Sequence, residues 1–185
     1  TRPYMRALTG LAGTLAVLGR SDEAAAHYQD MLRLNPNDDQ GARFRLLPLL
    51  VSLERHGDAE ALADMFPDEE AAEWAWLLAL NAFRREGDGA EARRRLEAAM
   101  AVNRHVAALV LAEEPPDGPT GSAAVDPGSL EEAGACARLV RPLWLATRGA
   151  AEWLAGAAAS SRKGRRASPA SRPAAATRGR RQPRR

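Results

Sequence analysis

The chain has 185 residues, which is enough for one domain or a short array of repeats but not for two large domains. Apolar residues make up 45% and charged residues 27%, as in an ordinary soluble globular protein, while aromatic residues make up only 5%. The net charge of +2 hides a division, because ten basic residues and no acidic residue lie between Ser161 and Arg185, and the remaining 16 basic and 24 acidic residues give the body a net charge near −8.

The first predicted elements form a helical hairpin. Leucines with helical spacing mark a first helix that ends at Gly19: Leu8, Leu11, Leu15 and Leu18. A second apolar stripe follows Ser21, a good N-cap residue, and stops at Asn35-Pro36: Ala24, Tyr28, Met31 and Leu32. No alternating β-branched or aromatic run with hairpin turns is found along the chain, so the fold is predicted to be all-α.

The hairpin pattern recurs twice more along the chain. Each hairpin has a turn glycine and a small residue in its second helix: Gly19 and Ala24, Gly57 and Ala61, Gly87 and Ala92. Both series span 68 residues in two steps, which gives a mean period of 34 with single steps from 30 to 38. This period is typical of tetratricopeptide repeats, which are helix–turn–helix units.

The matching residues make the resemblance to the tetratricopeptide repeat family specific. Residues 5–36 resemble one full repeat, residues 73–103 resemble a less regular one, and residues 42–66 resemble a degenerate copy with a shortened second helix. The resemblance implies a right-handed stack of helical hairpins, which is a tetratricopeptide-like α-solenoid.

Two short stretches resemble one branch of that family. They are TRPYMR at residues 1–6 and MLRLNPNDDQG at residues 31–41, and they are similar to bacterial relatives of the suppression-of-tumorigenicity proteins. Those relatives usually carry Asn where this chain has Asp39. The resemblance covers about residues 1–155 and concerns architecture, since it brings no catalytic residues with it. The chain begins with Thr1 rather than Met, so we expect it to be the C-terminal part of a longer protein.

The sequence divides into repeats, a linker, a cap and a tail: residues 1–112 (units of about 3–38, 39–67 and 69–104), 113–128, 129–157 and 158–185. Four prolines and three glycines predict the linker. Ser129-Leu130-Glu131-Glu132 has the capping-box pattern and opens a helix that would cover the end of the array. The tail is rich in Ala, Ser, Pro, Gly and Arg, and we expect it to be disordered.

Two prolines fall inside predicted helices. Pro48 lies within the helix predicted from Gln40 to Arg55, where it removes a hydrogen bond and crowds the carbonyl of Phe44. We expect a kink there rather than a helix end, because the leucines around it keep helical spacing. Pro142 has the same effect in the last long helix, where a break is equally compatible with the sequence.

The family resemblance also implies which residues line the inner surface of the stack. The first helix of each repeat lines that surface, and the matching positions are candidate partner-binding residues: Phe44, Val51, Arg55, Trp74, Asn81, Arg84 and Arg85. Such a groove would be apolar in the middle with arginines toward one end, which suits an amphipathic or acid-tipped peptide. The alternative is that the helix from Leu130 to Trp153 folds back and fills the groove, and the sequence leaves both open.

Residue patterns for catalysis are weak. His27, His56 and His105 are separated by 29 and 49 residues, so no zinc site is expected, and neither a phosphate-binding loop nor a nucleophile elbow is found. We therefore expect a non-enzymatic module that needs no cofactor and binds an unidentified protein or peptide.

The basic tail suggests a different function. Arg165, Arg166, Arg180 and Arg181 are candidate nucleic-acid contacts, because clustered cations release counterions from phosphates without sequence preference. The alternative function is thus an accessory protein that uses its tail to hold nucleic acid or another anionic surface. A solvated extension without a role accounts for the same composition.

Cysteine usage and hydropathy limit the location of the protein. Cys136 is the only cysteine, which excludes an intrachain disulfide and a cysteine-based metal site. Its neighbours supply no base, so we expect a small buried apolar role. No uncharged run approaches the roughly 20 residues that cross a bilayer. A reducing, cytoplasmic location fits these features.

Overall fold

The computed structural model describes residues 2–114, 117 and 125–167, and of residues 162–167 it describes the backbone alone. Within this part of the chain there are nine helices and no strand, which confirms the all-α prediction. The helices are α1 (Arg2–Val17), α2 (Ser21–Leu34), α3 (Ala42–Ser52), α4 (His56–Met65), α5 (Ala72–Glu86), α6 (Ala90–Val102), α7 (Val106–Val110), α8 (Leu130–Ala146) and α9 (Ala150–Ala167). None of these described helices combines the length and the apolar character that spanning a bilayer requires.

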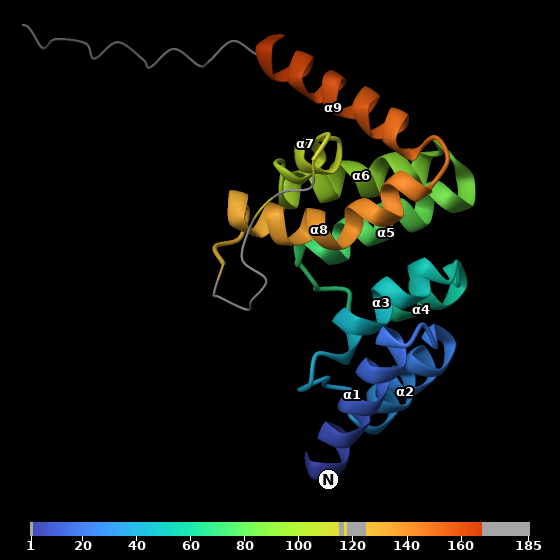
Figure 1. Ribbon diagram of the computed structural model, residues 1–185. Coiled ribbons are helices and arrows are strands. Elements are labelled where there is room, and N and C mark those ends of the chain that lie inside the picture. The colour runs from blue at the N-terminus through green and yellow to red at the C-terminus, as the bar shows by residue number, and fades with distance from the viewer. Residues whose placement is uncertain (1, 115–116, 118–124, 168–185) are drawn as a thin grey trace, which may run out of the picture.

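The first six helices pack as three pairs that follow one another along the molecule (Figure 1). α1 packs against α2, α3 against α4, and α5 against α6. Successive pairs are joined where α2 packs against α3 and where α5 packs against both α3 and α4. The apolar stripe of α2 is buried in these contacts: Ala24, Tyr28, Met31 and Leu32. Of the predicted stripe of the first helix, Leu15 is buried, whereas Leu11 and Leu18 are exposed.

The turns within the three pairs recur more evenly than the sequence suggested. A residue with positive φ follows the first helix of each pair: Gly19 (φ 75°), Glu54 (φ 56°) and Gly87 (φ 66°). The prediction that Gly57 is the second turn residue is wrong, because Gly57 lies inside α4. Glu54 comes 35 residues after Gly19 and 33 before Gly87.

The buried small residue of the second helix in the second pair is also earlier in the sequence than predicted. Five residues after each positive-φ residue comes an alanine with no exposed surface: Ala24, Ala59 and Ala92. Ala61, which the sequence pattern placed in this series, is exposed. The second pair thus has the same spacing of turn residue and buried alanine as the others, once its turn residue is taken as Glu54 instead of Gly57.

The first two turns also have identical backbone hydrogen bonds. The amides of Gly19 and Arg20 donate to the carbonyls of Ala16 and Leu15 (3.1 and 2.9 Å). The amides of Glu54 and Arg55 donate to the carbonyls of Val51 and Leu50 (3.2 and 2.9 Å). Both sets form a Schellman motif, which satisfies the last carbonyls of a helix and favours glycine at its left-handed position.

α8 folds back over the third pair and packs on α5 and α7 (Figure 1). The predicted N-cap is confirmed, because Ser129 Oγ accepts from the amide of Glu132 (3.1 Å). The Glu132 carboxylate accepts from the amide of Gly128 (2.7 Å), one residue before the position that a capping box uses. The buried side chain of Asn103, at the end of α6, donates to the Ser129 carbonyl (2.9 Å) and to Glu132 (2.8 Å). This fixes the start of α8 to the end of the third pair.

The helix boundaries near the two prolines and at the start of the tail differ in part from those predicted. α8 continues through Pro142, so the helix does not break there. α3 likewise continues through Pro48, but it ends at Ser52, short of the predicted Arg55. α9 runs to Ala167, so residues 158–167, which were expected to be disordered, are helical. Residues 168–185 lie outside the described part of the chain.

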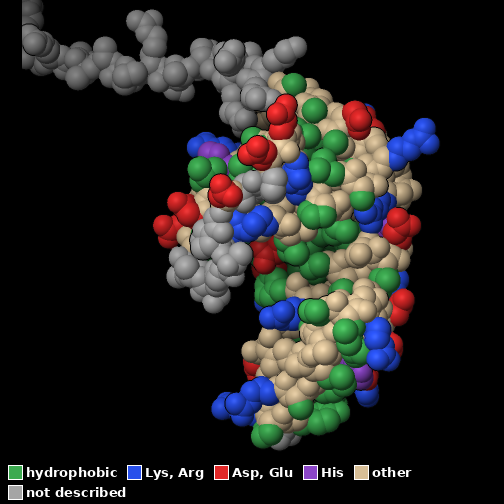
Figure 2. All heavy atoms as spheres, in the orientation of Figure 1, with side chains coloured by type: hydrophobic (Ala, Val, Ile, Leu, Met, Phe, Trp, Pro, Cys, Tyr) green, Lys and Arg blue, Asp and Glu red, His purple; other side chains and the backbone are tan. Residues whose placement is uncertain are grey.

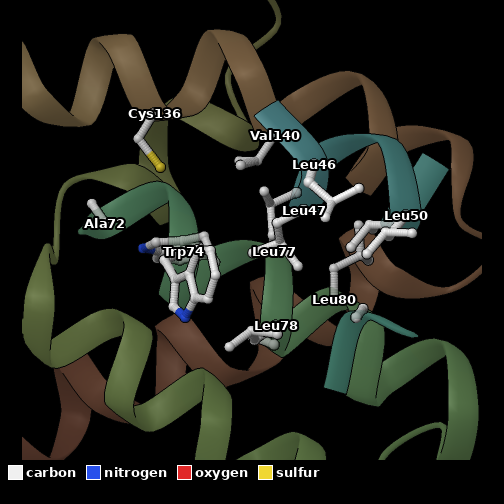
Figure 3. Close-up of a cluster of buried hydrophobic side chains, with 14 of the residues drawn as sticks. Leu46, Leu47, Leu50, Ala72, Trp74, Leu77, Leu78, Leu80, Cys136 and Val140 are labelled. Atoms are coloured by element: carbon white, nitrogen blue, oxygen red, sulfur yellow. The ribbon is translucent and has the colours of Figure 1, made fainter. Parts of the chain in front are cut away.

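α5 lies at the centre of the core. Nine of its 15 residues are buried, and the cluster in Figure 3 joins it to leucines of α3 and to Cys136 and Val140 of α8. The rings of Trp76 in α5 and Trp144 in α8 meet with centroids 5.8 Å apart. The core therefore draws on segments far apart in the sequence.

Candidate docking surfaces

Phe44 and Trp74 lie together in an aromatic cluster between α3 and α5. Their rings meet edge to face with centroids 6.1 Å apart, and Phe66 meets Trp74 in the same way at 6.2 Å. The Arg43 guanidinium lies 4.3 Å from the centroid of Phe44 and 4.9 Å from that of Phe66. Because Trp74 is only 4% exposed, this cluster joins two helix pairs and offers little free surface.

Arg43 is held in that cluster by two carboxylates. It donates to Asp38 (3.0 Å) and to Glu69 (2.8 Å). The buried Asp38 carboxylate also accepts from the amides of Ala42 (2.7 Å) and Arg43 (3.0 Å), and so satisfies the free amides at the start of α3. Asp39, which the family resemblance singled out, is exposed.

Arg84 and Val51 form a second group at the ends of two helices. The Arg84 guanidinium donates to the carbonyl of Val51 (2.5 Å), to Thr147 Oγ1 (2.8 Å) and to the carbonyl of Leu143 (3.4 Å). The side chain of Val51 has no exposed surface. Arg84 thus neutralises the carbonyl ends of α3 and α8, where cations are favourable, and burial lowers its pKa.

Asn81 and Arg85 form a third group, which faces α4 and α6. The side-chain amide of the fully buried Asn81 donates to Glu60 (2.8 Å) and accepts from His56 Nδ1 (2.7 Å). The Glu60 carboxylate also pairs with Arg95 (2.5 Å) and Arg85 (3.5 Å). This network satisfies the buried amide and ties together the helices of neighbouring pairs.

Arg55 stands apart from the other six residues. It pairs with Asp58 (2.7 Å) and donates to Gln29 of α2 (3.5 Å). The seven predicted partner-binding residues therefore lie in four different settings rather than along one open groove.

α8 accounts for part of this arrangement. α8 covers α5, where the inner surface of the third repeat was expected, and contributes Cys136 and Val140 to the core there (Figure 3). Of the two possibilities that the sequence left open, the structure favours the one in which this helix fills the groove over α5.

A hollow near the C-terminal end lies between α6 and α9. It has a volume of about 810 Å³ and an apolar floor: Leu96, Met100, Trp153 and Ala157. Among its rim residues are Asp88, Arg93, Glu97 and Glu152. α9 packs on α7 and α8 rather than along α6, which leaves this α6–α9 groove open.

Trp153 is fixed in the floor of the α6–α9 groove. Its ring stacks on Phe83 with centroids 4.6 Å apart, and its indole nitrogen donates to Asp88 (2.7 Å). Asp88 also pairs with Arg93 (2.6 Å). The hydrogen bonds from Arg93 and Trp153 lower the pKa of Asp88 to about 2, so its carboxylate is charged at neutral pH.

Two further hollows lie in the first half of the chain. One, of about 350 Å³, lies between α2, α3 and α4 and is mainly apolar, with the exposed Met65 at its edge. The other, of about 780 Å³, lies between the start of α1 and the α2–α3 loop. Figure 2 shows hydrophobic side chains gathered along the middle of the molecule, between the first helix pair and α9.

Sequence reasoning missed the α6–α9 groove because it placed binding on the first helix of each pair. One signal was present: Trp153 is a large aromatic residue in an otherwise small-residue segment, and Leu96 and Met100 lie four residues apart on one face of α6. The candidate nucleic-acid residues are not placed by the structure. Arg165 and Arg166 lie in α9 but their side chains are outside the description, as are Arg180 and Arg181 altogether.

Cys136 is buried among apolar side chains, as the sequence predicted. Burial raises the pKa of its thiol, and the nearby carboxylates of Glu73 and Glu132 raise it further, so the thiol is neutral and unreactive. Within the residues that the structure describes, no group of three His, Cys, Asp or Glu side chains lies close enough to hold a metal ion.

Comparison with known proteins gives no match: none was found among protein-family models, curated proteins or solved structures.

Proposed function

We propose that the chain is a non-enzymatic docking module of tetratricopeptide type, in which three helical hairpins stack as a right-handed α-solenoid that α8 closes. One observation carries this proposal: turn residues with positive φ at positions 19, 54 and 87 are each followed five residues later by a fully buried alanine. Spacings of 35 and 33 residues agree with the 34-residue period of that family better than the glycine spacing does.

The partner that suits such a stack is a protein helix. Rows of parallel helices leave grooves between them, and an amphipathic helix can bury its apolar face in such a groove. Two hollows of this kind border on helix pairs, the α6–α9 groove and the one between α2, α3 and α4. We place this binding in the cytoplasm, where the single buried thiol stays reduced.

Site-specific photo-cross-linking in the native cells tests the proposal. A photoreactive phenylalanine derivative replaces Met65 or Ala101, which line the two hollows, in the full chain. Matched controls carry it at Glu23 or Glu131, which are exposed and lie outside both hollows. We expect a discrete protein adduct from one of the hollow positions and none from the controls. Equal labelling at all four positions would contradict a docking function.

A further inference from the structure

We infer that the α6–α9 groove binds the apolar face of a basic amphipathic helix from a partner protein. This inference rests on the proposed docking function and names the site and the chemistry of its partner. It follows from the shape of the floor, the rigidity of Trp153 and the charges of the rim.

The floor of the groove has the shape that a third helix needs. Leu96 and Met100 lie four residues apart on α6, and Trp153 and Ala157 lie four residues apart on α9. Side chains at this spacing form a ridge along a helix, and two such ridges enclose a valley into which the apolar ridge of another helix packs. Ala101 and Gly156, which also line the groove, are small enough to allow close approach of a backbone.

Trp153 gives the groove a rigid anchor. Its ring is held by the stack on Phe83 and by the hydrogen bond to Asp88, so it needs no rearrangement when a partner binds. Fixed aromatic side chains in the centre of an interface contribute much of the binding free energy, because little side-chain entropy is lost.

The rim selects the charge of the partner. Arg93 is already paired with Asp88, whereas no ion-pair partner for Glu97 or Glu152 is found among the described residues. Both glutamates are exposed at the edge of the apolar floor. Lysines or arginines beside the apolar stripe of a docked helix would meet them, whereas glutamates there would be repelled.

Binding of two synthetic helical peptides to the full chain tests this inference. The peptides have about 14 residues, a length of about 21 Å, and share one leucine stripe, which is flanked by lysines in one and by glutamates in the other. Fluorescence anisotropy measures each affinity at physiological salt. We expect the lysine peptide to bind at least about tenfold more tightly, with Glu97→Lys and Glu152→Lys together reversing that order.

Three further variants separate this site from a general charge effect. Glu131→Lys makes the same kind of charge change at an exposed position of α8 and should alter either affinity by less than about twofold. Met100→Asp should weaken both peptides because it places a charge on the floor, and Arg104→Asp is its exposed control. The circular dichroism of each variant must match that of the unaltered chain.

Two results would overturn the inference. One is the absence of binding by either peptide, and the other is a loss with Glu131→Lys as large as that with the groove variants. Cross-linking from Met65 without cross-linking from Ala101 would leave the docking function in place and move the site to the hollow between α2, α3 and α4.

Discussion

The first helices of the first and third pairs have different surroundings. Three of the 16 residues of α1 are buried, whereas nine of the 15 residues of α5 are. α5 is covered by α3 and α4 on one side and by α8 on another, while Tyr4 and Leu11 of α1 remain 58% and 46% exposed. The first helix of a pair is therefore part of the buried core in the third pair, whereas in the first pair it leaves apolar side chains exposed. Trp74 and Asn81 of α5, which were predicted to meet a partner, are buried within the fold.

Removing a leucine from each of these helices should give the largest difference. Leu80 of α5 has no exposed surface, and Leu80→Ala should lower the free energy of unfolding by about 3–4 kcal/mol through lost burial and a cavity. Leu11→Ala on α1 should cost less than about 1 kcal/mol, because that side chain is 46% exposed. Urea unfolding followed by circular dichroism measures both. Equal losses would show that α1 is covered in solution.

The neighbouring arginines of α5 sharpen the comparison. Arg84→Ala should lower the free energy of unfolding by about 2–3 kcal/mol, because the carbonyls of Val51 and Leu143 lose a charged donor. Arg85→Ala should cost less than about 1 kcal/mol, since its side chain is 51% exposed and its contact to Glu60 is 3.5 Å long. Chemical unfolding distinguishes the two. A larger loss for Arg85 would contradict the structural role given to Arg84.

The left-handed turn residues should give the smallest effects, of opposite sign. Glu54→Gly should raise the free energy of unfolding by about 0.5–1 kcal/mol, because glycine adopts a φ of 56° without strain. Gly19→Ala should lower it by about 1 kcal/mol through backbone strain alone, since an added Cβ would meet no atom within 4 Å. Thermal unfolding detects both shifts. Glu54→Gln keeps the side chain without its charge and should leave stability nearly unchanged if strain is the cause.

The ends of the helices could be predicted where the chemistry is local. Gly19 and Gly87 indicate their turns because glycine is the residue that adopts a positive φ without strain. Ser129 indicates the start of α8 because its hydroxyl caps a free amide of the first turn. At the second turn a glutamate adopts the positive φ, so the nearby Gly57 misled the assignment by three residues. The lesson is that a spacing argument depends on the residue that actually adopts the turn.

The candidate site was harder to predict because its surroundings come from distant segments. Arg84 has the residue type of a binding surface, but its partners Thr147 and Leu143 come about 60 residues later in the sequence. No periodicity within α5 indicates that α8 lies there. The α6–α9 groove likewise depends on the direction in which α9 leaves the body, which follows from its packing on α7 and α8.

The joint between α2 and α3 has a consequence for motion. It is the main contact that holds the first helix pair to the rest. The third pair, by contrast, is held by contacts of α5 with α3, α4 and α8. Local opening is cheapest where few buried contacts must be broken, so amide protons of α1 and α2 should exchange with solvent before those of α5. Limited proteolysis would then trim the molecule from its N-terminal end while α5 stays intact.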